Sequence, residues 1–171
     1  MPTPIYISIE GRLQGNITEG AFTPDSVGNI FVEGHEDEIL VQEVKHRITV
    51  PSDPQSGQPT GRRVHGPFIF TSAINKATPL LNQALTAGEI LPTVLVSWYR
   101  TSVDGKEELF FMTKLEDAMI VEINCILPHV QNPKNANFTQ LVEVAMTYRK
   151  ITWTHMISGT QGSDDWRNPK I

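Results

Sequence analysis

The chain has 171 residues, of which 39% are apolar, and its 14 basic and 19 acidic side chains give a net charge of −5. This length fits one domain, and the apolar content excludes a disordered chain. The isoelectric point near 5.5 disfavours nucleic acid as a partner, because that binding depends on Lys and Arg, and the lack of an 18-residue apolar stretch excludes insertion into a membrane as a helix.

The N-terminus and the cysteine content predict where the protein is made. Residues 1–6 contain neither a basic start nor an apolar run, so we expect no cleaved signal peptide. Cys125 is the single cysteine, which excludes an internal disulfide and a multi-cysteine zinc site. We therefore expect synthesis in the cytosol, with any export by a route that needs no cleaved signal.

The first half of the chain predicts mainly strands. Apolar residues alternate with polar ones at 5–9, 38–50 and 68–73, as they do in strands with one buried face. A further short strand is expected at 27–33.

A long loop is expected between the strands at 38–50 and 68–73. Residues 51–61 contain three prolines and two glycines, which are not expected to continue a sheet ladder or a helix. Loops of this length are usually functional or mobile. His46 and His65 flank this loop, and we interpret them as structural or interfacial residues.

One helix is predicted, at about residues 75–87. Thr78 is a suitable N-cap, and Pro79 suits the first helical turn. From Leu81 onward, apolar residues recur with helical spacing. Gly88 is expected to end the helix.

The second half again predicts strands. An Asp-Gly pair at 104–105 predicts a hairpin turn, and a tight corner is expected at 116–117. Cys125 is expected on an apolar strand face, as a small buried hydrophobe, and the tail from 158 shows no periodicity. The predicted strands cover 91–101, 107–115, 118–127 and 138–153.

This order of elements predicts a mainly β fold, namely a small closed β-barrel of two packed antiparallel sheets with one flanking α-helix. Residues 94–96 and 109–112 are apolar or bulky on both strand faces. One helix cannot cover that much sheet, which indicates that the outer face of some strands meets another subunit. Burial by loops of the same chain is the alternative explanation.

No cluster of residues predicts catalysis or metal binding. Residues 34–38 (GHEDE) lack the second histidine of a zinc protease, because Ile39 occupies its position. Cys125 and His129 do not predict a nucleophile pair, because a reactive thiolate needs an exposed electropositive setting. We therefore expect no enzyme activity, no cofactor and no metal.

Seven short motifs together resemble one family. In chain order they are YISIEG (6–11), GHEDE (34–38), PSDPQSGQP (51–59), KATPLL (76–81), WYRTS (98–102), YRKI (148–151) and GSDDWR (162–167). The chain resembles the Hcp family, the tube proteins of bacterial type VI secretion systems. The resemblance runs from end to end.

The resemblance implies a homohexameric ring whose copies stack into a hollow tube. Such a tube would lie inside contractile sheath proteins, carry a VgrG spike at its tip and hold secreted effectors in its lumen. It would be assembled in the bacterial cytoplasm and then secreted to the extracellular space or a target cell. Residues 1–171 would form one Hcp-like barrel domain with an extended loop at about 51–63 and no C-terminal toxin extension.

The resemblance also implies two sets of site residues. The first is a ring-stacking loop, for which we name Pro51, Asp53, Gln55, Ser56, Gln58, Thr60 and Arg62. The second is the interface between subunits, for which we name His35, Glu36, Phe110, Phe111, Tyr148 and Arg149.

An alternative function is a small monomeric or dimeric β-barrel that carries a ligand. Such a carrier needs an apolar cavity, whereas a barrel of this size usually fills its interior with side chains. Size-exclusion chromatography with negative-stain imaging distinguishes the two, since rings favour the tube and a compact monomer favours the carrier.

Overall fold

The computed structural model describes residues 3–168. Two α-helices, α1 (Pro24–Val27) and α2 (Thr78–Ala87), and two 3₁₀ turns, η1 (Gly28–Ile30) and η2 (Pro133–Asn135), accompany a large amount of β structure. The strands are β1 (Ile5–Gly11), β2 (Gly15–Asn16), β3 (Ile39–Lys45), β4 (Ile48–Thr49), β5 (Val64–His65), β6 (Phe68–Ala73), β7 (Leu91–Thr101), β8 (Glu107–Ile126), β9 (Leu141–Thr147), β10 (Lys150–His155) and β11 (Thr160–Asp165).

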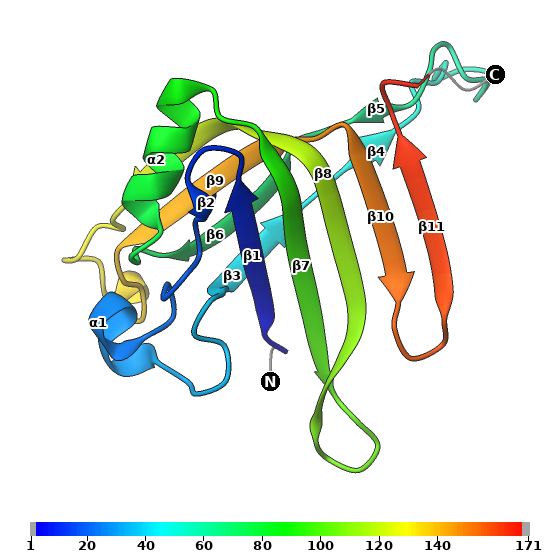
Figure 1. Cartoon of the computed structure of the whole chain (residues 1–171). Coiled ribbons are helices and arrows are strands. Elements are labelled where there is room, and N and C mark those ends of the chain that lie inside the picture. The colour runs from blue at the N-terminus through cyan, green and yellow to red at the C-terminus, as the bar shows by residue number, and fades with distance from the viewer. Residues whose placement is uncertain (1–2, 169–171) are drawn as a thin grey trace.

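The strand pairings close into a barrel. Following hydrogen-bonded neighbours, the order β1–β3–β6–β9–β8–β7 returns to β1, and every pair is antiparallel. β10 and β11 extend the sheet outward from β8, and α2 lies outside the barrel (Figure 1). The predicted fold class, a β-barrel with one flanking helix, is confirmed.

The barrel interior is filled by alternating apolar side chains. In β7, Val94 and Val96 are fully buried, and in β6, Phe68 and Phe70 are buried in the same way. Alternation with a period of two places these side chains on one face of each strand. The largest fully buried residues are Tyr148, Phe22, Phe68, Phe70, Ile7, Ile9, Ile17, Ile39, Leu81, Leu91, Leu115 and Met146.

Strand β8 differs from the sequence prediction. The corner expected at residues 116–117 does not divide it, and one strand runs from Glu107 to Ile126. Asp117 has φ of 51°, and near it the strand changes partner, pairing with β7 as far as Ala118 and with β9 from Met119 onward. The left-handed conformation of Asp117 lies where one continuous strand passes from pairing with β7 to pairing with β9, and a residue-by-residue pattern does not reveal this change.

Four further element predictions are wrong. Residues 27–33 form no strand: Val27 ends α1, 28–30 form η1, and 31–33 belong to no helix or strand. Thr23 O accepts the first helical bonds from Ser26 N and Val27 N. The predicted strand at 38–50 is divided into β3 and β4, and the one at 138–153 is divided into β9 and β10 by the turn at 148–149. The tail contains β11, which lacks apolar alternation and is held by pairing with β10.

Helix α2 begins at Thr78 with Ala77 as its N-cap, so the predicted cap is displaced by one residue. Asn75 takes the capping role, because its Oδ1 accepts from Ala77 N at 2.8 Å while its own N–H donates to Thr78 Oγ1 at 3.1 Å. Gly88 ends the helix in the left-handed conformation, as predicted. Leu81 and the neighbouring apolar residues face the core, where the helix packs against β8.

Position 11 has no room for a side chain. A Cβ atom there would clash with Glu89 Oε2 and lie 2.9 Å from Ile17 Cδ1. The Glu89 carboxylate is buried and accepts bonds from Leu13 N and Gln14 N at 3.2 Å each. We expect Gly11→Ala to lower the free energy of unfolding by about 1–3 kcal/mol, because it overpacks this site, as measured by urea denaturation.

Gly61→Ala is the matched control, since the nearest atom to its Cβ would be Pro51 Cγ at 3.8 Å. We expect this control to change the free energy of unfolding by less than about 0.5 kcal/mol. Equal stability of the two variants would contradict the packing argument.

Candidate functional site

The segment between β3 and β6 folds back on itself as a two-stranded ribbon, defined here as residues 46–65. β4 and β5 pair antiparallel, Ser52 bridges Pro59, and Thr60 N donates to Pro51 O at 2.8 Å. Proline carbonyls still accept hydrogen bonds, so one isolated bridge forms here, but residues 51–61 contain neither strand nor helix, as expected. The ribbon projects from the barrel close to the C-terminal segment (Figure 1).

The tip of the ribbon is an ordered turn. Asp53 N donates to Gln58 O, and Gly57 N donates to Asp53 O, both at 2.8 Å. Gln55 N donates to Asp53 Oδ1 at 2.8 Å. This hydrogen bond from the backbone N–H lowers the pKa of the Asp53 carboxyl. Gly57 has φ of 73°, a conformation that glycine adopts without strain.

The ribbon presents most of its side chains to solvent. Of the seven predicted stacking residues, six are exposed and Asp53 is half-buried. Three apolar ribbon side chains are also exposed, with relative accessibilities of 39% for Ile48, 51% for Val50 and 48% for Val64. The predicted stacking residues are therefore gathered on the ribbon, together with exposed apolar side chains that the prediction did not include. The register of β4 and β5 places Ile48 and Val64 on opposite faces of the ribbon.

A buried hydrogen-bond chain holds the base of the ribbon. His46 Nε2 lies 2.7 Å from the Tyr148 hydroxyl, which lies 2.6 Å from His65 Nδ1. His65 Nε2 lies 2.7 Å from Asp164 Oδ2, and Arg63 Nε donates to the same oxygen at 2.6 Å. Both legs of the ribbon are thus connected through Tyr148 to β11.

The second leg of the ribbon also binds the segment after β11. Arg63 Nη2 donates to Asp165 O at 3.1 Å and to Asn168 O at 2.9 Å. The Trp166 ring stacks on the His65 ring, with centroids 5.6 Å apart and planes 30° apart. These contacts fix the ribbon base against residues 164–168.

Tyr148 and Arg149, predicted as subunit-interface residues, form the turn between β9 and β10. The Tyr148 ring is buried within the chain, and burial, with Asp164 nearby, raises the pKa of its hydroxyl. Arg149 pairs with Asp117 at 2.8 Å and with Asp165 at 2.5 Å. Within one chain both side chains have structural partners, and their contribution to an interface stays a prediction.

His35 and Glu36, also predicted at the interface, lie side by side but differ in setting. The His35 ring stacks on Tyr6, with centroids 3.7 Å apart and planes 7° apart, and its Nδ1 lies 3.2 Å from Glu38 Oε1. Burial raises the pKa of Tyr6 to about 12. Glu36 is exposed, and the pKa of its carboxyl is lowered by a backbone amide of residue 34. Glu36 is therefore the one of the two that is free to contact another molecule.

Phe110 and Phe111 lie on β8 and are half-buried. The Arg100 guanidinium lies 4.8 Å from the centroid of the Phe110 ring, a cation–π contact. Phe111 packs edge-on against Trp98 at 6.2 Å. Both rings keep accessible area, as the predicted interface requires.

A hollow of about 320 Å³ opens beside Phe111, between β3 and β6 on one side and β7, β8 and β10 on the other. It is the feature that bears on the ligand-carrier alternative, because its walls are largely aromatic. Its lining residues are Val44, His46, Phe68, Trp98, Phe111, Thr113 and Trp153.

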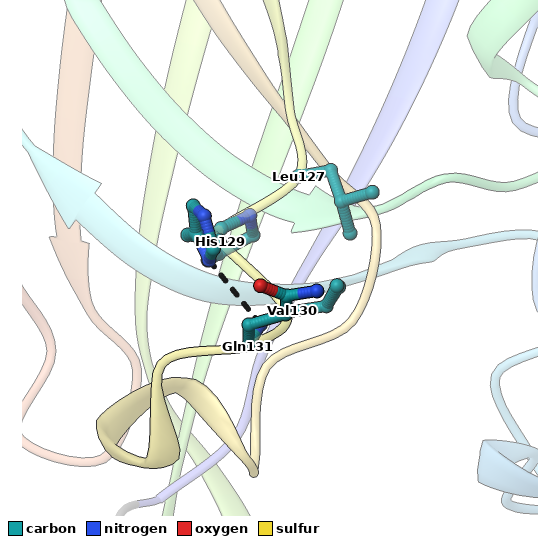
Figure 2. A pocket seen from close by; sticks show the side chains of 5 residues that line it. Leu127, His129, Val130 and Gln131 are labelled. Carbon is teal, nitrogen blue, oxygen red and sulfur yellow. Dashed lines mark hydrogen bonds between the residues drawn. The ribbon is translucent and has the colours of Figure 1, made fainter.

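A second hollow, of about 380 Å³, lies on the loop after β8 and is lined by the consecutive residues 127–131. Figure 2 shows these side chains, with Gln131 N donating to His129 Nδ1 at 3.2 Å. Leu127 and Val130 are exposed there. No second element faces these residues across the hollow, so it brings no set of chemical groups together.

Sequence reasoning missed the partners of the ribbon base. His46 and His65 were expected to be structural or interfacial, but nothing in the pattern joined them to Tyr148 or Asp164, which lie about a hundred positions further along. The acidic and aromatic residues at 162–167 were a sequence signal that could have indicated a partner for the two histidines. The prediction that Cys125 is buried is wrong, since its side chain is exposed. Its pairing with the buried Val142 still places it on the apolar face of β8, as expected, but one residue before the strand ends.

The described part of the chain, residues 3–168, holds neither a cluster of metal ligands nor a membrane-spanning helix. Within residues 3–168, no three His, Cys, Asp or Glu side chains are grouped so that they could hold a metal ion. No helix in the same range is long and apolar enough to cross a membrane.

Comparison with known proteins gives consistent matches. The family described as "Type VI secretion system effector, Hcp" matches residues 6–155. The "Major exported protein" of Pseudomonas aeruginosa is 57% identical over 169 residues, which cover 99% of this chain and 98% of that protein.

Solved structures agree with the sequence matches. A structure described as "Crystal structure of Hcp protein" is 55% identical and superposes with a TM-score of 0.91, covering 96% of this chain and 100% of that one. The secreted protein Hcp3 from Pseudomonas aeruginosa is 49% identical, with a TM-score of 0.84 and coverage of 98% and 100%. The chain therefore belongs to the Hcp family of type VI secretion proteins.

Proposed function

We propose that this chain forms homohexameric rings, and that the rings stack into the inner tube of a type VI secretion system. Its family makes it a secreted structural component of that system. In the proposed assembly the tube lies within contractile sheath proteins and carries a VgrG spike. Secreted effectors would bind in the ring lumen.

The observation that carries this proposal is the match of almost the whole chain, in sequence and in fold, to Hcp proteins. The export of this protein would follow assembly in the bacterial cytoplasm. The name of the Pseudomonas aeruginosa relative, an exported protein, supports this route.

The ribbon is proposed as the stacking element. It projects from the barrel (Figure 1) and exposes Ile48, Val50 and Val64, which its own barrel leaves uncovered. An ordered tip loses little conformational entropy on docking. A ring requires a second contact, between two different patches of neighbouring subunits, for which we propose the surface around Glu36, Phe110 and Phe111.

The ligand-carrier alternative rests on the aromatic hollow of about 320 Å³. Size-exclusion chromatography with light scattering separates the two functions. A six-fold multiple of the 19.1 kDa chain and ring-shaped particles in negative stain support the tube. A monomer or dimer under the same conditions contradicts it and favours the carrier.

Deletion of residues 55–60 tests the ribbon. We expect rings to form normally, because these residues are exposed and contact no core side chain, while stacking of rings into tubes becomes weaker. Electron microscopy counts rings and tubes in the same sample. Tube formation unchanged by the deletion would remove the ribbon from the stacking proposal.

A matched pair of substitutions controls for nonspecific effects of altering the surface. Val50→Asp places a charge on the ribbon, and Val103→Asp places the same charge on the fully exposed β7–β8 turn. We expect only the first to reduce tube formation. An equal loss in both would show a general effect of charge.

A further inference from the structure

The ribbon base contains two histidines that share one hydroxyl group. His46 comes from the first leg of the ribbon and His65 from the second, and both rings contact the hydroxyl of Tyr148. The side chain of His65 is 1% exposed, and Tyr148 is buried as completely. Bulk water therefore does not replace the bonds of His65, whereas His46 is half-buried. The hydrogen positions along the chain are coupled.

The Asp164 carboxylate, at one end of the chain, determines which atom donates in each hydrogen bond. An ionised carboxylate only accepts, so His65 donates from Nε2 to Asp164. In a neutral imidazole the other nitrogen is then an acceptor, and the Tyr148 hydroxyl donates to His65 Nδ1. The hydroxyl oxygen in turn accepts from His46 Nε2. With both histidines neutral, every group in the chain has a donor matched to an acceptor.

One added proton reverses the chain without breaking it. If His65 is protonated, its Nδ1 donates to the Tyr148 oxygen, and the hydroxyl turns to donate to His46 Nε2. His46 then carries its hydrogen on Nδ1. The Asp164 carboxylate, bound to both Arg63 and His65, compensates the added charge.

A second proton destabilises the chain. With both rings protonated, two N–H groups point at one hydroxyl oxygen, and its own hydrogen has neither ring nitrogen as acceptor. An unmade hydrogen bond in a buried site is costly, and two positive rings also repel each other.

The charged groups that surround the hydrogen-bond chain differ between its two ends. Arg63 pairs with Asp164, and Arg149 pairs with Asp117 and Asp165, so the charges on the β11 side have partners. On the barrel side, the hollow around His46 is lined by uncharged, largely aromatic residues of β6, β7, β8 and β10. His46 thus lacks a compensating charge from the barrel.

We propose that this hydrogen-bond chain is a proton-operated latch, which holds the ribbon against residues 164–168 while at most one of the two histidines is protonated and releases it when both are. The proposal concerns a single chain and stands apart from the proposed function. It makes ribbon mobility, and any contact that the ribbon forms, dependent on pH.

The direction of the pH dependence is set by His46. Burial, and secondarily the charge of His65, lowers the pKa of His46, whereas a histidine in an unfolded chain titrates at about 6.5. The stability that the latch contributes is therefore complete above about pH 6.5. It is lost as the pH falls through the lowered pKa of His46.

Hydrogen–deuterium exchange of the full chain tests the latch. Peptides covering residues 48–62 are compared at pH 7.5 and 5.0, after correction for the intrinsic pH dependence of exchange. We expect the corrected exchange of the ribbon to be about tenfold faster or more at pH 5.0, since each pH unit changes a titrating population by about tenfold. Equal corrected rates at the two pH values would overturn the proposal.

Three variants make the test specific. His46→Gln still offers an N–H to the Tyr148 hydroxyl but takes no proton, so its ribbon should stay protected at both pH values. Tyr148→Phe removes the shared hydroxyl, so its ribbon should exchange fast at both. His129→Gln, in the exposed loop after β8, should behave as the unaltered chain does.

Light scattering in the same buffers reports the assembly state, so that loss of rings is recognised. Acceleration at pH 5.0 that persists in His46→Gln would mean that the histidine pair does not control the ribbon, and it would overturn the latch. A ribbon in Tyr148→Phe that still responds to pH would do the same.

Discussion

Replacing Asp164 with alanine is expected to lower the free energy of unfolding by about 3–5 kcal/mol, the cost of removing one partner from a buried charged pair. The carboxylate is the end point of the ribbon-base chain and lies 2.7 Å from His65 Nε2. The His65 side chain is 1% exposed, so water does not replace the missing acceptor. Arg63 loses its carboxylate partner in the same step.

Urea denaturation at equal protein concentrations measures this loss, because assembly makes stability depend on concentration. Asp25→Ala, at an exposed position of α1, is the control and should change stability by less than about 0.5 kcal/mol. Asp164→Asn keeps an acceptor for His65 and should fall between the two. A loss below about 1 kcal/mol in Asp164→Ala would contradict the assigned pairing.

Replacing Phe70 with alanine is expected to cost about 3–5 kcal/mol, through lost burial and the cavity that remains. Phe70 is fully buried on β6, where it pairs with Val44 of β3 and Val144 of β9. These pairings join neighbouring strands of the closed barrel, so the cavity would lie between them. Thermal and urea denaturation measure the change.

Phe138 offers the matched control for this substitution. It lies outside the strands and is 56% exposed, so Phe138→Ala removes the same atoms from a largely solvated position. We expect a loss below about 0.5 kcal/mol there. Similar losses in both variants would show that Phe70 does not occupy the packed position described.

The fold class was predictable because the barrel strands follow simple alternation. Val94 and Val96 are buried as the pattern indicates, and the helix ends at Gly88 for the reason that glycine adopts the left-handed conformation without strain. Where the local pattern and the tertiary structure agree, sequence reasoning succeeds.

Two of the failures share one cause, which is pairing between distant segments. β11 has few apolar residues and exists because β10 bonds to it. The bend at Asp117 was interpreted as a break between strands, yet the ladders on both sides continue through it. A third failure, Cys125, has another setting: it lies on the apolar face, opposite the buried Val142, yet it is exposed one residue before β8 ends.

The sequence predicted a long projecting loop at the ribbon, but not the contacts that hold its base. The prolines of the ribbon indicated a long projecting segment, and the side chains at its tip are exposed as a contact surface requires. The chain from His46 through Tyr148 to Asp164 joins three regions far apart in sequence. Spacing along one sequence does not encode such a meeting, because only the closed barrel brings the three regions together.

Strand β8 has a consequence for how the molecule unfolds. Its first half bonds to β7 and β10, and its second half bonds to β9. Neither the β7 side nor the β9 side of the barrel can separate without breaking a ladder of this shared strand, so we expect the barrel to melt as one cooperative unit. Substitutions as distant as Gly11, Phe70 and Asp164 therefore act on the same all-or-none transition, and their effects can be compared on one free-energy scale.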